Sequence, residues 1–424
     1  MAGEFYSNSD SIKILYPTGS LEPVVNEDLV VRPKLKSVLP MGSQKMGEGV
    51  IRFPAFLSPA QNVGQVADNG TLPTAKDRTE RTFELKPVAF AAVFQIGWTM
   101  KAAVKAKGGF NGGEQARRTE ETANNLGKFI EQTYVGTAGD GIRGYVESDG
   151  ANSVKAKLPH GVTLIRDNHV ISVRVSAGGA VRDTLDNRTV TTVDVDNRDI
   201  YYNGADQTAV LNDPIYIVTE ASMTLTNVFA NGIRGLIDDG VNSQFIHGLD
   251  RTTTANLKLR SQVYDPGTLH NLTEQTLLIM ANNIRQYSNK RPETILCGPG
   301  QAMKYAEFVA PQRRFPTDGG PVKPTQGFKE EDLVFYAPGV ALRFMISYDV
   351  IPRELYLLNW STFFQYLAQE MDWMDEDSLL KATPTSGGHK ASWLAYMGSV
   401  ENLGNFYPRG NGVVRNARDP LIGD

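Results

Sequence analysis

Apolar and polar residues recur along this chain with the periods of both helices and strands. From residue 113 to residue 135 the apolar positions follow the three- and four-residue spacing of one helix face, at Ala116, Ala123, Leu126, Ile130 and Tyr134. Asn111 and Glu114 have the form of a capping box, and Gly136 is placed to end the helix. The pattern predicts a helix about 34 Å long. Its charged face is expected to carry Arg117, Arg118, Glu120 and Glu121.

Two later regions have different periods. Residues 155–221 alternate apolar and polar residues or run β-branched between Gly, Asn and Asp, which predicts a β-rich insertion. Residues 271–309 then predict a helix, a strand and a second helix. Asn271 and Glu274 are the expected cap of the first helix, and Pro299 suits the first turn of the second. The inner face of the first helix is predicted at Leu277, Met280, Ala281, Ile284 and Tyr287.

Residues 47–92 predict an extended hairpin. Between Leu57 and Thr82 there is no Phe, Tyr or Trp, and one end is strongly charged through Lys76, Asp77, Arg78, Glu80 and Arg81. A stretch of this kind has no core of its own, and an isolated hairpin is marginal in water. We therefore expect its order to depend on a surface that it lies against, with a neighbouring subunit as the first candidate.

Composition narrows the class of protein. The chain has 424 residues, enough for two or three domains, and a net charge of -4, which gives no general attraction to a phosphate backbone. The longest apolar run, 88–94, is too short to cross a bilayer, which needs about 20 residues. The N-terminus lacks the pattern of a signal peptide. The single cysteine, Cys297, excludes an intrachain disulfide and is expected to be buried and inert.

Residues that carry catalytic or metal chemistry do not form a recognisable set. The five histidines, His160, His169, His247, His270 and His389, occur singly, without metal-ligand spacing. The acidic pair Asp238 and Asp239 and the run 330–332 are predicted to be solvated acidic faces. No nucleotide loop and no set of nucleophile, base and orienting residue is evident. The sequence predicts no metal, no cofactor and no enzyme activity.

Three motifs, in their order along the chain, resemble the major capsid proteins of tailed double-stranded DNA bacteriophages. They are V-x-D-N-G-x-x-P at 66–73, T-F-E-L-K-P-V-A at 82–89, and a long helix ending in V-G-T-A-G-D-G at 135–141. Further on, GIRGLIDDG at 232–240 and FIHGLDR at 245–251 are similar to a segment found in many such proteins. The resemblance covers most of the chain from about residue 47 onward.

The resemblance implies an α+β fold of the Hong Kong 97 type. The expected division is an N-terminal arm at 1–46, an extended loop hairpin at 47–92, a peripheral domain with the spine helix at 93–154, and the β-rich insertion at 155–221. The rest of the chain is expected to form a peripheral and axial region at 222–310, an axial domain at 311–390, and a return to the peripheral domain at 391–424.

The resemblance also implies function and partners. It implies a structural protein that self-assembles as pentamers and hexamers into an icosahedral phage head around double-stranded DNA, in the virion and, during assembly, in the host cytoplasm. A separate scaffolding protein, a portal and a decoration protein are the further partners, and no membrane is involved. The charged loop residues are expected to contact a neighbouring subunit, and Lys76 is the candidate for a covalent crosslink. An encapsulin-like shell and, more distantly, a soluble enzyme remain alternatives.

Overall fold

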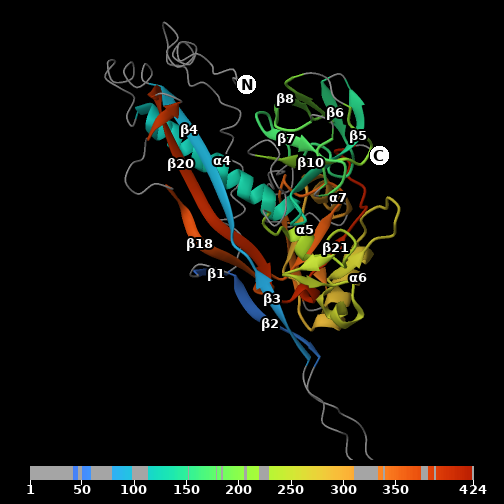
Figure 1. Ribbon diagram of the computed structural model, residues 1–424. Helices are drawn as coiled ribbons and strands as arrows, with labels where there is room; N and C mark the ends of the chain where they lie inside the picture. Colours follow the sequence, from blue (N-terminus) through green and yellow to red (C-terminus); the bar gives the residue numbers. More distant parts are fainter. Residues whose placement is uncertain are drawn as a thin grey trace, which may run out of the picture. The chain divides into compact units, whose positions relative to one another are not determined.

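The computed structural model describes residues 42–45, 50–58, 79–97, 113–150, 152–177, 179–182, 185–204, 208–218, 229–309, 333–337, 340–373, 381–385 and 388–422. The chain forms two compact units. One contains Met1–Val38, Ala89–Glu131 and Leu367–Glu401, and the other contains Leu39–Val88, Gln132–Tyr366 and Asn402–Asp424. Helices and strands both occur throughout the described residues (Figure 1), which gives the α+β class that the sequence predicts.

A six-stranded mixed sheet forms the core of the larger unit. Its order is β13 (Gln262–Tyr264), β21 (Gly412–Val414), β17 (Leu355–Leu358), β14 (Thr294–Cys297), β16 (Val340–Ile346) and β15 (Val334–Ala337). Strand β14 pairs parallel with β16 and antiparallel with β17. Every residue of β14 and β17 is buried, as expected for central strands covered on both faces. The predicted burial of Cys297 in β14 is confirmed.

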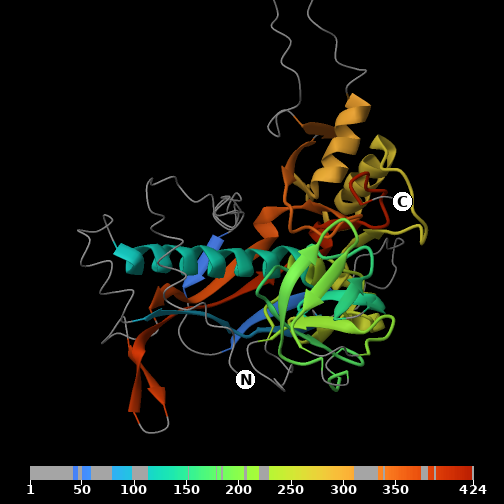
Figure 2. The same ribbon diagram turned by 90° about the horizontal axis from the view of Figure 1, so that it is seen from above.

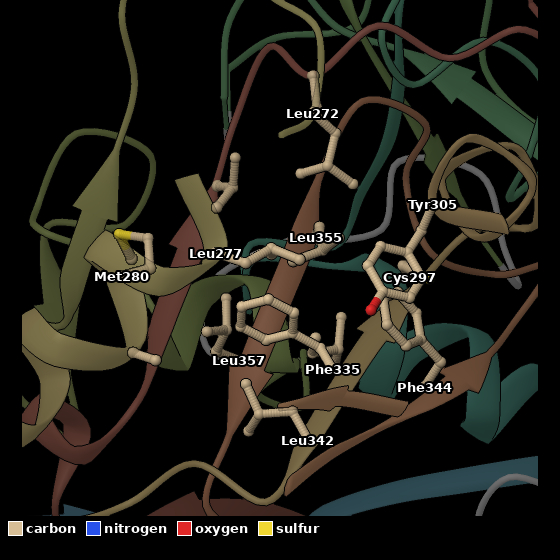
Figure 3. Packing of buried hydrophobic residues seen from close by; sticks show 14 of the residues in the cluster. Leu272, Leu277, Met280, Cys297, Tyr305, Phe335, Leu342, Phe344, Leu355 and Leu357 are labelled. Atoms are coloured by element: carbon tan, nitrogen blue, oxygen red, sulfur yellow. The ribbon is translucent and has the colours of Figure 1, made fainter. Parts of the chain in front are cut away.

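Two helices, α6 (Glu274–Ser288) and α7 (Pro299–Val309), contribute to the buried cluster on this sheet. Figure 3 shows Leu277 and Met280 among the buried side chains, and the ring of Tyr305 stacks on Phe344 with centroids 4.5 Å apart. The predicted inner face of α6 is confirmed at its first four positions, but Tyr287 is 50% exposed. At helical spacing Tyr287 falls at the edge of the buried face, and the buried position in the last turn is Ser288.

The predicted cap of α6 is also corrected. The N-cap is Thr273, whose side chain accepts a hydrogen bond from the Thr276 amide, and not Asn271. A capping residue must directly precede the first helical residue with extended backbone angles, and Thr273 does so. Pro299 begins α7, as predicted.

The β-rich insertion is a closed six-stranded barrel, drawn in green in Figures 1 and 2. Its strands are β5 (Ile142–Gly150), β6 (Ser153–Ala156), β7 (Val170–Val173), β8 (Arg188–Asp194), β9 (Asp199–Tyr202) and β10 (Pro214–Ile217). The interior is fully buried and aliphatic, with Val146, Val154, Ile171, Val190, Ile200 and Ile215. The barrel begins at Ile142, before residue 155, because β5 closes it by pairing with both β6 and β10.

The predicted long helix is α4 (Gly113–Gly136), drawn as one continuous helix in Figure 2. Its apolar face is buried at Leu126, Ile130 and Tyr134. A five-stranded sheet has the order β1 (Gly42–Lys45), β18 (Phe363–Trp373), β20 (Gly388–Asn405) and β19 (Lys381–Thr385), with β4 (Val88–Gly97) also paired to β20. Of the predicted arm at 1–46, only β1 lies within the described residues, and it forms an edge strand of this sheet.

The predicted hairpin is present as the antiparallel pair β2 (Ile51–Ser58) and β3 (Thr79–Leu85). The stretch between them, 59–78, lies outside the described residues. The hairpin ends at Leu85 and not near residue 92, because β4 belongs to the five-stranded sheet. Pro87, which has no backbone N–H to donate, lies in the break between β3 and β4.

None of the helices that the structure describes is long and apolar enough to cross a membrane. The division of 222–310, 311–390 and 391–424 between peripheral and axial regions stays a prediction.

Candidate functional site

Only part of the predicted contact site is described. Lys76, Asp77 and Arg78 lie outside the described residues, whereas Glu80 and Arg81 lie on β3 with exposed side chains. On the charged face of α4, the side chains of Arg117 and Arg118 also lie outside the described residues, Glu120 is exposed, and Glu121 is half-buried. These positions suit a contact surface, and their role in contacts stays a prediction.

The base of the hairpin is anchored in its own chain. Phe53 and Phe83 face each other across β2 and β3 with ring centroids 5.0 Å apart. Phe53 also meets Phe364 edge-on at 5.5 Å, and Ile51 and Leu85 pack with Tyr366 in a small buried cluster. Edge-to-face ring pairs of this kind add about 0.5–1.5 kcal/mol beyond their buried area. The strands Ile51–Ser58 and Thr79–Leu85 therefore lie against residues of their own chain, and the expected contact of the charged end with a neighbouring subunit stays a prediction.

His247 joins this base to a second part of the chain. Its ring lies edge-on to Phe53 and Phe83, with centroids 5.6 and 5.3 Å away, and its carbonyl accepts the Glu84 amide at 2.8 Å. The ring Nε2 accepts the Asn405 amide at 3.0 Å. Burial lowers the pKa of His247 to about 3, so the ring is neutral at physiological pH. In the sequence His247 is marked only by its place in the FIHGLDR motif. The spacing of residues along the chain does not predict its contact with the hairpin.

Strand pairing at the base includes one ion pair. Arg52 and Glu84 are directly opposite in the β2–β3 register, and their Nε and Oε1 atoms are 3.0 Å apart. Their side chains are 70% and 42% exposed, so the pair contributes less than about 1 kcal/mol. The aromatic cluster therefore holds the base, and the ion pair supports its register.

A hollow of about 620 Å³ opens beside the base of the hairpin. Its wall includes residues 84–86 at the end of β3, the turn at 138–140, and the segment 242–245. Burial raises the pKa of Asp140 in this wall, although the Ile142 amide donates to its carboxylate at 3.1 Å. The glycines on either side of Asp140, Gly139 and Gly141, have φ of +84° and +76°, a backbone conformation that favours glycine, and they form the turn after α4.

The GIRGLIDDG motif lies against the end of α4. It contains the short helix α5 (Ile233–Leu236), which follows Gly232. A Cβ at Gly232 would lie 2.1 Å from the Thr137 carbonyl oxygen, and one at Gly235 would lie 1.9 Å from that of Ala138. Only glycine allows this close approach of two backbones. These glycines of the motif therefore serve packing against the end of α4.

Asp238 in the same motif is fully buried and organises the loop that follows. Its carboxylate accepts the amides of Gly240, Asn242 and Ser243 at 2.7, 3.1 and 2.9 Å, and it pairs with the guanidinium of Arg415. The prediction of a solvated acidic face is wrong here, because Arg415 comes from the far end of the sequence and no local pattern indicates it.

Arg251 completes this buried network with backbone partners. Its Nη1 donates to the Asp238 carbonyl at 2.7 Å, and its Nη2 donates to the Gly235 carbonyl at 2.8 Å. Burial lowers the pKa of Arg251 to about 10, which leaves it charged at neutral pH. The network fixes a loop.

Among the described residues, histidines and acidic residues do not assemble a metal centre. Across the part of the chain that the structure describes, no group of three or more His, Cys, Asp or Glu side chains is close enough to hold a metal ion. His160 and His247 are buried, and burial lowers the pKa of His169 to about 4. The side chain of His389 and the run 330–332 lie outside the described residues.

Comparison with solved structures defines the class of this fold, an α+β capsid fold. The structure that carries the assignment is the cyanophage A-1(L) capsid asymmetric unit, which is 13% identical to this chain and has a TM-score of 0.57. The match covers 95% of this chain and 99% of the cyanophage chain. The capsid of the native GTA particle is 7% identical over 94% of this chain and 96% of its own, with a TM-score of 0.48.

A third neighbour is the SrpI encapsulin from Synechococcus elongatus PCC 7942, 10% identical over 98% of this chain and 96% of its own, with a TM-score of 0.43. No argument rests on the GTA and encapsulin likenesses, because both scores are below 0.5. No protein-family model and no curated protein matches the sequence.

Proposed function

We propose that this chain is the major capsid protein of a tailed double-stranded DNA bacteriophage, with a fold of the Hong Kong 97 type. Its role is structural: copies associate as pentamers and hexamers into an icosahedral head in the virion. The observation that carries the proposal is the likeness to the cyanophage A-1(L) capsid over nearly the full length of both chains.

Assembly follows from many modest contacts. Subunits on a closed lattice each contact several neighbours, so individually weak interfaces multiply into a stable shell. In this proposal the hairpin is the lattice contact: its base is fixed by Phe53, Phe83 and His247, and the charged residues Glu80 and Arg81 are exposed. Exposed charge pairs contribute about 0–1 kcal/mol each, so they set register more than strength.

Electron microscopy of the purified chain, with and without a co-expressed scaffolding protein, tests the proposal. The expected result is closed icosahedral shells that elute in the void volume of a sizing column. A small oligomer under both conditions would contradict it. Shells that hold an enzyme cargo in place of DNA would favour the encapsulin alternative.

The proposed crosslink through Lys76 has a separate test. Particles are boiled in denaturant and run on a gel, with a Lys76→Arg variant as the control. A covalent link predicts a ladder of multimers in the wild type that the variant lacks. Monomer bands alone would remove Lys76 from this role and leave the shell proposal intact.

A further inference from the structure

The six-stranded barrel has a buried core of its own. Every residue of its buried cluster lies between Val146 and Ile215, within the stretch of chain that forms the barrel. The strands close on themselves, because β10 pairs with β5 on one side and with β7 on the other. The interior of the barrel therefore remains buried whatever the outside of the barrel lies against.

The chain enters and leaves the barrel at one place. Ile142, the first residue of β5, lies opposite Tyr216 near the end of β10, and the turn at 139–141 leads into it. Ile142, Tyr216 and Val218 form a small buried cluster, and the Tyr216 ring stacks on Phe229 with centroids 5.9 Å apart. We call these four residues the stem of the barrel. Because both connections run side by side through the stem, a rotation about it leaves the strand pairing of the barrel intact.

A polar seam joins the barrel to the rest of the fold. Arg143 of β5 donates from Nη2 to Thr133 Oγ1 in α4 at 2.6 Å. Arg166, in the loop between β6 and β7, places Nη2 3.7 Å from Asp349 Oδ1. The same Asp349 oxygen accepts a hydrogen bond from Gln132 Nε2 in α4 at 3.4 Å. Asp349 lies in the turn after β16, so it connects the barrel, the end of α4 and the core sheet.

The charges of the polar seam centre on Asp349, which is 9% exposed. Burial lowers the pKa of Arg143 to about 10, which leaves it charged at neutral pH, and Asp349 and Asp140 are the acidic groups that act on it. His169 lies near Arg143 and Arg166, and burial lowers its pKa to about 4, so its ring adds no charge at neutral pH. Asp349 is thus the carboxylate that acts on both arginines of the seam.

Leu164 adds an apolar contact across the seam. It is fully buried, and a Cβ at Gly136 in α4 would lie 2.5 Å from its Cδ2 atom. Opening the seam would hydrate the polar groups and uncover Leu164, whereas unfolding the barrel would uncover its whole aliphatic interior. Opening the seam therefore requires less free energy than unfolding the barrel, as in the partial openings that folded proteins undergo.

We propose that the polar seam is a latch: Asp349 holds the barrel on the end of α4, and the barrel leaves this position as a folded unit that turns about its stem. The consequence for a shell rests on the proposed self-assembly. Pentamers and hexamers place the same chain beside neighbours at different angles, and a barrel that turns as a unit meets both without a change in its own fold.

Hydrogen exchange of the unassembled chain tests the latch. Asp349→Asn removes the charge with almost no change in size. Residues 133–137 and 160–166 report on the two sides of the seam, and β7 and β8 report on the barrel itself. The matched control is Asp213→Asn, the same substitution at a carboxylate that accepts Arg182 Nε and Nη2 at 2.6 and 2.8 Å inside the barrel region. Circular dichroism checks that each variant is folded.

The expected result for Asp349→Asn is exchange about tenfold faster at the seam segments, with β7 and β8 unchanged, because a hydrogen-bonded charge is lost only at the seam. Asp213→Asn is expected to speed exchange in β7 and β8, because its lost partner lies within the barrel region. Asp349→Glu keeps the charge and is expected to speed exchange at the seam less than Asp349→Asn does.

Unchanged exchange at the seam in Asp349→Asn would overturn the proposal, since Asp349 would then hold nothing in place. Equal acceleration at the seam and in β7 and β8 would overturn it as well, because the barrel would then open together with its surroundings. The measurement needs no assembled shell. Failure of the proposed function is therefore a separate result, a wild-type chain that forms no shell at any concentration.

Discussion

Glycine is the only residue that fits at Gly232 and Gly235, and this constraint comes from another part of the chain. A side chain at either position would collide with a backbone carbonyl oxygen after α4, at Thr137 or Ala138. Backbone atoms cannot rotate away as a flexible side chain can. The glycines therefore set the distance between the end of α4 and the loop that Asp238 organises.

Gly235→Ala is expected to destabilise the folded chain by about 3 kcal/mol, because its Cβ would lie 1.9 Å from the Ala138 oxygen. The matched control is Gly127→Ala within α4, where the nearest atom, Met371 Cε, is 4.0 Å away. Alanine there is expected to raise stability by about 0.5–1 kcal/mol through helix propensity. Urea unfolding of the unassembled chain measures both, and equal effects of the two substitutions would contradict the packing argument.

Asp238→Asn is expected to cost about 3 kcal/mol or more, because Arg415 would remain buried without its main carboxylate and the loop amides would lose a charged acceptor. Asp239→Asn is the control: that side chain is 33% exposed and 3.6 Å from Arg415, so a loss below about 1 kcal/mol is expected. The midpoint of thermal unfolding compares the two. The larger loss is expected for Asp238→Asn, and an equal or larger loss for Asp239→Asn would contradict the prediction.

At the scale of elements, the hairpin β2–β3 is a surface element with a buried base. Its register places Phe53 against Phe83 and Ile51 against Leu85, and all four contribute to the base or its buried cluster. Outward positions such as Thr82 are exposed. The hairpin is thus tied to the fold at one end by ring contacts and by the Glu84 amide bonded to His247.

Phe83→Ala is expected to release the base of the hairpin, at a cost of about 3–5 kcal/mol for a buried aromatic residue. The expected observation is faster hydrogen exchange at the Glu84 amide and faster protease cleavage within residues 51–85. Thr82→Ala, on the exposed side of the same strand, is the control and should leave both rates unchanged. Equal exchange rates in the two variants would show that the ring cluster does not hold the hairpin.

At the scale of the whole molecule, neutral histidines lie at separate places in the fold, with His160 and His247 buried and His169 half-buried. His160 and His169 belong to the barrel region, and His247 lies at the hairpin base. Burial lowers the pKa of His169 to about 4 and that of His247 to about 3, and it lowers the pKa of His160 well below its usual value. In the unfolded chain each titrates near its ordinary value, about 6.5.

Acid is therefore expected to destabilise the unassembled chain before most carboxylates titrate. Below about pH 6.5 the unfolded chain binds protons that the folded chain does not, so stability is full above that pH and falls toward about pH 4 to 3. Each histidine contributes a slope of up to about 1.4 kcal/mol per pH unit. Urea midpoints at pH 7, 6 and 5 measure the slope of stability against pH. His247→Gln should lower that slope by the contribution of one histidine, because the variant lacks one of the titrating rings. Identical midpoints at pH 7 and pH 5 would refute this expectation.

Local sequence patterns predicted the helices and strands that depend on residues close to one another in the sequence. The period of Leu126, Ile130 and Tyr134 predicted α4, because one helical face repeats every three or four residues. Pro299 predicted the start of α7, because its fixed φ and missing N–H suit the first turn of a helix. Tyr287 was misjudged because it lies at the edge of the helix face that Leu277 and Ile284 occupy, and spacing alone does not tell how far burial extends around the helix.

The sequence by itself determined the α+β class, the long helix, the β-rich insertion and the presence of a hairpin without aromatic residues between Leu57 and Thr82. Tertiary structure alone decided that this hairpin has a base of Phe53, Phe83 and His247, that the barrel starts at Ile142, and that Asp238 is buried against Arg415. The physical reason is range: propensity and periodicity act within a few residues, whereas burial and ion pairing depend on groups that meet only after the chain has folded.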